Sequence, residues 1–117
     1  MTKAIREQVY SKYHGRCAYC GRKIDYKDMQ VDHLIPQLEF TYGNVAGDKD
    51  DISNLMPSCR ICNHYKRAES LETFRKWIET IPEKLGERQY IYKVGMAYGF
   101  FDDTHRKVRF YFEEKEE

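Results

Sequence analysis

The chain has 117 residues, of which 41% are hydrophobic and 15% aromatic, and this length predicts a single domain over residues 1–117 with a small core. No run of about 18 apolar residues occurs and the start lacks an apolar signal region, so we expect a cytoplasmic protein without membrane contacts. The formal net charge of +1 is lower than is usual for a nucleic-acid-binding domain.

The first predicted element is a helix over residues 2–14, with Thr2 as its cap. Its apolar stripe recurs every four residues, at Ile5, Val9 and Tyr13. This face is expected to pack on the core.

Two cysteine pairs follow at metal-binding spacing, Cys17-x-x-Cys20 and Cys59-x-x-Cys62. Such pairs predict a tetrahedral zinc site. Disulfides would fit a cytoplasmic chain poorly, and a redox motif would explain one pair but not two. Because four sulfurs leave no open coordination position, the Zn²⁺ is expected to be structural.

The segment between the two pairs reads as a strand followed by a loop. Residues 29–36 form a short strand that ends at a proline, and the polar, glycine-containing residues 37–53 indicate a loop. Asp32 and His33 are adjacent in this strand, so they need a twist or bend to serve one site. A short helix is expected to begin near Arg60.

The C-terminal half predicts two helices and a hairpin. The helices cover residues 70–81 and 83–98, with a proline between them. Residues 107–113 alternate apolar and polar side chains, which indicates a strand. This strand is expected to pair with residues 99–101 through a turn at residues 102–105.

The ordered set of motifs resembles the HNH endonuclease family. The motifs are Asp32-His33-Leu34-Ile35-Pro36, Asn54-Leu55 and Cys59-x-x-Cys62-Asn63-x-x-Lys66, with the first cysteine pair upstream as in zinc-bearing members. The resemblance implies an α+β fold with a ββα-metal core clipped by the four-cysteine zinc site. An N-terminal helix and C-terminal helices with a short strand or hairpin would flank this core. The chain would then consist of a motif core (17–67), a C-terminal extension (68–112) and an acidic tail (113–117).

The same resemblance implies a metal-dependent endonuclease that hydrolyses phosphodiester bonds in DNA, expected to be double-stranded. His33 would be the general base, since the pKa of histidine lies near neutrality. A zinc ligand or a buried structural histidine is the alternative reading. Asp32 would ligate a catalytic Mg²⁺ or Mn²⁺ ion, because such ions prefer carboxylate oxygen. A turn or capping aspartate is the alternative there.

The remaining family positions receive roles in the same way. Asn63 would be the second metal ligand, and His64 is the alternative, because adjacent helical residues point about 100° apart. Asn54 would bond the backbone and hold the general base in place. Lys66 and Arg67 would contact phosphate, and a solvated lysine is the alternative for Lys66.

Two non-enzymatic readings stay open. One is a non-catalytic, zinc-stabilised nucleic-acid-binding module. The other is a zinc-dependent module that binds protein, which the near-neutral charge favours.

Overall fold

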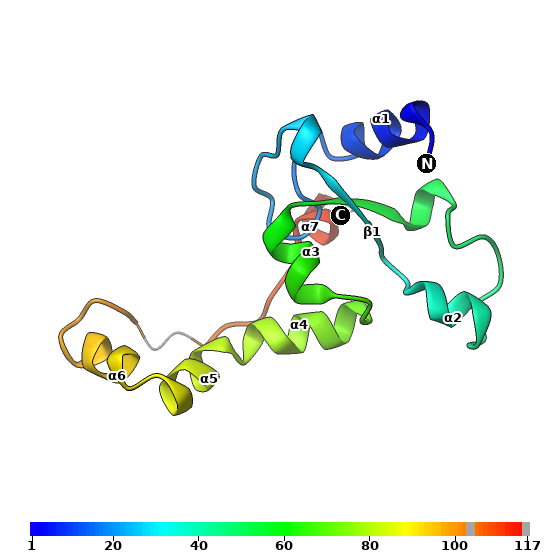
Figure 1. The fold of residues 1–117 in the computed structure, drawn as a ribbon. Coiled ribbons are helices and arrows are strands. Elements are labelled where there is room, and N and C mark those ends of the chain that lie inside the picture. Colours follow the sequence, from blue (N-terminus) through cyan, green and yellow to red (C-terminus); the bar gives the residue numbers. More distant parts are fainter. Residues whose placement is uncertain (103–104, 116–117) are drawn as a thin grey trace. The chain divides into compact units, whose positions relative to one another are not determined.

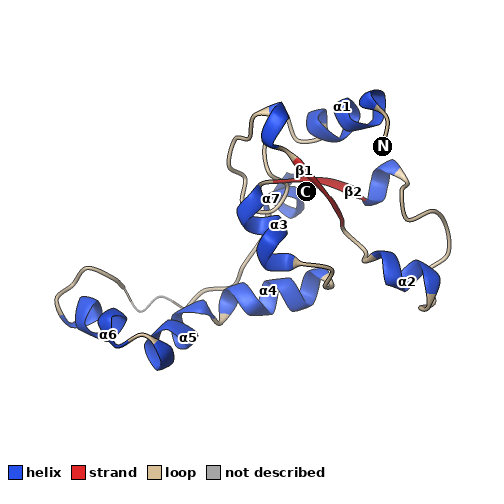
Figure 2. Cartoon of the chain, in the orientation of Figure 1, coloured by secondary structure: helices blue, strands red, loops and turns tan. Residues whose placement is uncertain are grey.

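The computed structural model describes residues 1–102 and 105–115. In these residues the chain forms seven α-helices and one small antiparallel sheet (Figures 1 and 2). None of the described helices is long and apolar enough to cross a bilayer. The chain divides into two compact units, Met1–Leu71 with Arg109–Glu117 and Glu72–Val108, where its length predicted one domain.

The elements of the first unit are α1 (Lys3–Ser11), η1 (Tyr26–Asp28), β1 (Gln30–His33), α2 (Gln37–Thr41), η2 (Ile52–Asn54), β2 (Leu55–Ser58), α3 (Arg60–Lys66) and α7 (Tyr111–Lys115). The remaining helices are α4 (Leu71–Glu79), α5 (Ile81–Arg88) and α6 (Tyr90–Ala97).

The sheet consists of β1 and β2 in antiparallel register. Asp32 lies opposite Met56, and His33 lies opposite Leu55. All four residues of β2 are buried. A small cluster of Val9, Met29 and Leu55 joins α1 to the sheet. The sheet therefore carries the Asp32-His33 pair at the end of β1, as the sequence predicted.

Helix α1 begins as predicted and ends earlier than predicted. The Thr2 hydroxyl caps it by accepting a hydrogen bond from the third residue of the helix, at 3.1 Å. The helix stops at Ser11 rather than at His14. His14 and Gly15 have φ angles of 57° and 77°, which belong to the left-handed region and cannot continue a right-handed helix.

The segment 37–53, predicted as a loop, contains the short helix α2 and the start of η2. The Asp51 carboxylate caps η2 by accepting from the Ser53 amide at 2.9 Å. A local side-chain cap of this kind makes a single helical turn stable without an apolar stripe. Hydrophobic periodicity could therefore not detect it.

The single helix predicted over residues 83–98 is two helices. The chain leaves helical geometry at Gln89, where φ is −121° and ψ is 99°, and α6 contacts α5. The Phe101 ring lies against Gly95, where a Cβ would approach it to 2.5 Å, and it stacks on Tyr92 at 5.3 Å. Residues 99–101 thus fold back onto α6 instead of forming a strand.

The strand predicted over residues 107–113 is also wrong, because residues 111–115 are the helix α7. The Glu113 carboxylate accepts a hydrogen bond from the Phe110 amide at 2.8 Å. This contact is half of a capping box and starts a helix at a position where alternation alone favours a strand. The predicted turn at residues 102–105 includes residues 103–104, which lie outside the described residues.

Candidate functional site

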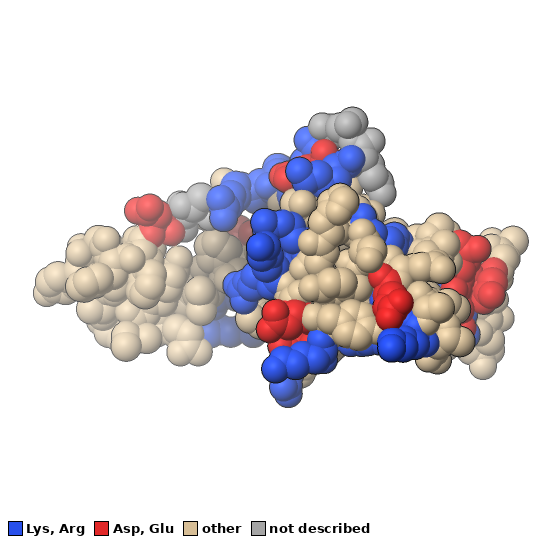
Figure 3. All heavy atoms as spheres, turned by 90° about the horizontal axis from the view of Figure 1, so that it is seen from above, with Lys and Arg blue, Asp and Glu red and all other residues tan. Residues whose placement is uncertain are grey.

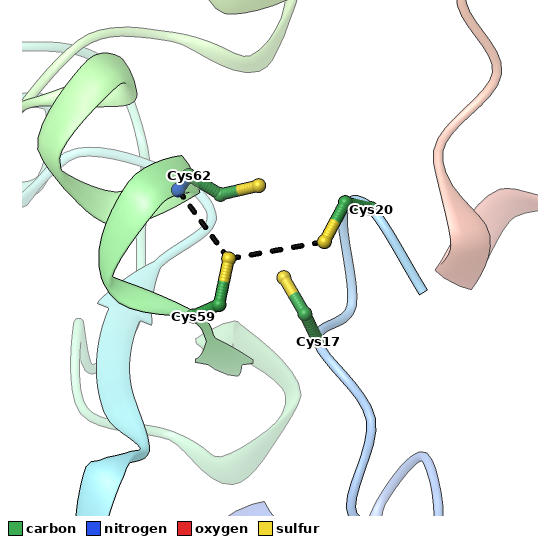
Figure 4. Close-up of side chains that lie close together, drawn as sticks. All are labelled: Cys17, Cys20, Cys59 and Cys62. Carbon is green, nitrogen blue, oxygen red and sulfur yellow. Dashed lines mark hydrogen bonds between the residues drawn. The ribbon is translucent and has the colours of Figure 1, made fainter. Parts of the chain in front are cut away.

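The four cysteines meet at one point of the first unit (Figure 4). Cys17 and Cys20 come from the turn after α1, and Cys59 and Cys62 come from the start of α3. Their sulfur atoms all lie within 4.8 Å of one another, and those of Cys20 and Cys59 are 3.8 Å apart. Four thiolates at about 2.3 Å from a tetrahedral ion would be separated by about 3.8 Å. The cluster is therefore positioned to bind a metal ion.

Each pair is shaped by its local backbone. Gly21 follows the first pair with φ of 78°, and its amide bonds the Cys17 carbonyl at 3.0 Å, which closes a tight turn. In the second pair the Cys59 sulfur caps α3 by accepting from the Cys62 amide at 3.4 Å. A hydrogen bond from the Ala18 amide to the Pro57 carbonyl, at 2.8 Å, ties the two turns together.

The pKa values of Cys17, Cys20 and Cys62 differ because the sulfur atoms are close together. A hydrogen bond from Cys62 lowers the pKa of Cys17 to about 4. Donating that proton raises the pKa of Cys62, and burial raises the pKa of Cys20 to about 11. A metal ion would replace these protons, because thiolates are its ligands.

The Asp32 side chain is buried. Its Oδ2 atom accepts a hydrogen bond from the Tyr19 hydroxyl at 2.5 Å and lies 3.0 Å from the Lys66 ammonium. Burial, reinforced by the charge of Asp32, raises the pKa of Tyr19, so its hydroxyl stays protonated and donates. The carboxylate is thus paired and fixed in orientation.

Lys66 lies differently from the phosphate contact that the family pattern implied. It is fully buried, and its ammonium donates to the His33 carbonyl at 3.1 Å in addition to its contact with Asp32. A lysine in this position cannot reach a phosphate without breaking a buried ion pair. Its place in the structure is that of an internal counter-charge.

His33 points toward the loop before η2. Its Nε2 atom is 2.8 Å from the Asp50 carboxylate, and its Nδ1 atom is 3.4 Å from the Gln37 amide nitrogen. Because a carboxylate only accepts, Nε2 donates and Nδ1 carries the lone pair. The hydrogen bond from His33 lowers the pKa of Asp50. The His33 side chain is 19% exposed, so solvent can reach it.

Asn54 binds the backbone on both sides of the site. Its side-chain oxygen accepts from the Ile35 amide at 2.8 Å, and its nitrogen donates to the carbonyls of Ile35 and Lys49 at 3.2 and 2.9 Å. The Leu34 amide adds a bond to the Asn54 carbonyl at 2.9 Å. These contacts join the segment after His33 to the loop.

Asn63 lies on the same side of β1 as Asp32. Its amide donates to Gln30 at 2.5 Å, while Lys66, one turn later on α3, contacts Asp32. Gln30 and Asp32 are two residues apart on the strand, about 7 Å by the usual rise, and their side chains share one face of it. The bonds from Asn63 and Lys66 thus place α3 over this face of β1. His64 faces solvent.

Three partner residues of the site were not singled out from the sequence: Tyr19, which bonds Asp32; Gln30, which bonds Asn63; and Asp50, which bonds His33. Only Gln30 carried a signal, because it is two residues before Asp32 in a strand and so shares its face. Tyr19 lies in the turn of the first cysteine pair and Asp50 in a polar loop. In neither place does the spacing of residues indicate where a side chain points.

Residues 17–69 match the family HNH endonuclease. The fold is similar to the crystal structure of the Type II-C Cas9 enzyme from Actinomyces naeslundii, with a TM-score of 0.50 and 26% identity. That match covers 62% of this chain, which spans only 8% of the length of that chain. A search of the curated proteins gave no match.

The matched segment contains both cysteine pairs, the two strands and α3, which together form the site described above. Residues 17–69 of this chain are therefore an HNH endonuclease family domain.

Proposed function

We propose that the chain is a metal-dependent DNA endonuclease with His33 as general base. The supporting observation is the arrangement at the end of β1, where His33 has one ring nitrogen held by Asp50 and its backbone tied by Lys66. A histidine oriented in this way presents a defined nitrogen to a water molecule.

The four-cysteine cluster is proposed to hold a structural Zn²⁺ ion. All four ligands are sulfur atoms, which bind Zn²⁺ and not hard cations such as Mg²⁺. Four protein ligands also leave no coordination position for substrate. The cluster joins the turn after α1 to the start of α3. The ion would thus set the position of α3, and with it the position of Asn63.

Asp32 and Asn63 are proposed to hold a catalytic Mg²⁺ or Mn²⁺ ion. The donor chemistry fits, because one carboxylate and one amide oxygen are hard ligands and such ions keep several waters. When bound, the cation would polarise the scissile phosphate and stabilise the charge of the leaving oxygen. Tyr19 and Lys66 occupy Oδ2 of Asp32, while the bond to Gln30 occupies the nitrogen of Asn63 and leaves its oxygen available.

In this proposal His33 removes a proton from the attacking water through Nδ1. Asp50, bonded to Nε2, then stabilises the imidazolium that forms. Gln37 must move from Nδ1 before water can occupy that position, and its 3.4 Å contact is weak enough to allow this. Asn54 keeps the loop and the strand end together throughout.

Double-stranded DNA is the proposed substrate. Arg67 is exposed at the end of α3 and remains the candidate for a phosphate contact, in place of Lys66. Figure 3 shows Lys and Arg side chains in several groups on one face, with Asp and Glu side chains between them. This mixed surface predicts binding through a few local contacts and therefore a small dependence of affinity on salt.

The buried Asp32–Lys66 pair is the observation that favours the second candidate, a non-catalytic nucleic-acid-binding module. In that case the carboxylate serves stability and has no cation to bind. Binding of DNA without cleavage would support this reading.

A plasmid-cleavage assay with Mg²⁺ or Mn²⁺ tests the proposal. His33→Ala should lower the rate by about 10²–10⁴-fold, the usual contribution of a general base. His105→Ala, an exposed histidine of the second unit, serves as the matched control and should cut at the wild-type rate. Asn63→Ala and His64→Ala, compared at limiting Mn²⁺, identify the second ligand. An intact plasmid after incubation with folded, zinc-loaded wild type would refute the enzymatic function.

A further inference from the structure

Tyr19 connects the four-cysteine cluster to the proposed catalytic carboxylate. It lies between Cys17 and Cys20, is 3% exposed, and donates its hydroxyl hydrogen to Asp32 at 2.5 Å. The turn that supplies two of the four sulfurs therefore also supplies a hydrogen bond to β1.

The C-terminal segment holds the Tyr19 ring from the other side. The rings of Phe110 and Phe112 meet it edge to face at 5.5 and 6.1 Å, with interplanar angles of 80° and 88°. The Tyr111 amide donates to the Tyr19 carbonyl at 3.0 Å, and the Phe112 amide donates to the Ala18 carbonyl at 2.8 Å. Ring and backbone of Tyr19 are thus both fixed by residues more than 90 positions away in sequence.

The two donors on Asp32 share one oxygen. Tyr19 and Lys66 both bond Oδ2, from the cysteine turn and from α3 respectively. Two donors on one oxygen fix the rotation of the carboxylate, and they leave Oδ1 as the atom directed away from them. Partners of this kind orient metal ligands in proteins and strongly affect metal affinity.

We infer that Tyr19 is a positioning residue for Asp32, and that the segment Arg109–Lys115 belongs to the site because it clamps Tyr19. This inference rests on the proposed function, since it assumes that Asp32 binds a divalent cation. It assigns to the C-terminal segment a role that its sequence pattern does not indicate.

The test compares Tyr19→Phe with Tyr10→Phe in zinc-loaded protein. Both variants lose one hydroxyl that donates a hydrogen bond, but that of Tyr10 bonds the Ile24 carbonyl at 2.8 Å, outside the site. Binding of Mn²⁺ is measured by electron paramagnetic resonance without DNA, together with zinc content, melting temperature and plasmid cleavage. Tyr19→Phe should weaken Mn²⁺ binding about 10–100-fold while keeping its zinc, and Tyr10→Phe should bind Mn²⁺ as wild type does.

A second variant, Phe112→Leu, keeps the Tyr19 hydroxyl and removes one ring contact. It should weaken Mn²⁺ binding in the same direction and to a smaller extent. Unchanged Mn²⁺ affinity in Tyr19→Phe would overturn the inference. The proposed function would still stand in that case, provided that the wild-type protein cuts the plasmid. Loss of zinc from Tyr19→Phe would also overturn it, because the role would then be structural. If wild type neither binds Mn²⁺ nor cuts DNA, the proposed function fails and the inference fails with it.

Discussion

Replacement of Lys66 by methionine tests whether this residue is an internal counter-charge or a phosphate contact. Its ammonium lies 3.0 Å from Asp32, and the two side chains are 1% and 7% exposed. Methionine preserves most of the side-chain volume and removes the charge. The variant would therefore leave a buried carboxylate with the Tyr19 hydroxyl as its remaining partner.

The expected cost is large. Removing one partner of a buried ion pair destabilises a protein by about 3–5 kcal/mol. For a unit of this size each 1 kcal/mol lowers the melting temperature by roughly 4–8 °C, so Lys66→Met should melt at least about 12 °C below wild type. Lys49→Met is the matched control, because Lys49 pairs with Asp50 at the surface, where both side chains are at least 40% exposed. Such a pair contributes about 0–1 kcal/mol.

Thermal denaturation followed by circular dichroism, with zinc in excess, measures both variants. A double variant, Lys66→Met with Asp32→Asn, should recover part of the lost stability, because the uncompensated charge is gone. If Lys66→Met melts together with Lys49→Met, the counter-charge assignment is refuted. A phosphate contact would instead weaken DNA binding and reduce its salt slope by about 1 without a change in melting temperature.

Three further predictions concern the neighbouring groups. Asn54→Ala loses three hydrogen bonds in a buried position. It should lower the free energy of unfolding by about 1–3 kcal/mol in urea denaturation and also slow cleavage. A variant as stable as wild type would contradict the role of Asn54 in joining the strand end to the loop. Asp50→Asn can donate as well as accept, so ¹⁵N spectra of the His33 ring should show a changed balance of its two tautomers, and unaltered spectra would exclude Asp50 as the orienting group. Zinc binding at pH 7 should release at least two protons per ion, measured with a pH indicator. The reason is that the raised pKa values of Cys20 and Cys62 keep both thiols protonated in the metal-free protein. Release of fewer protons would show that these thiols are already ionised.

The sequence by itself determined the parts of the site that depend on local spacing. Two Cys-x-x-Cys pairs predicted a metal cluster, and the structure brings their sulfurs within 4.8 Å. The strand before Pro36 and the helix near Arg60 are present because short-range periodicity and proline act within a few residues. The family match over residues 17–69 follows from the same motifs.

Only the tertiary structure decided which side chains face inward and which partners they meet. Lys66 reads as a basic surface residue, yet the approach of α3 to β1 buries it against Asp32. Residues 107–113 alternate like a strand, but a local cap and the contact with the cysteine turn make residues 111–115 a helix. Charge, alternation and motif spacing are properties of neighbours in the sequence. Burial and pairing depend on elements that are distant in the chain, and these are fixed only when the chain has folded.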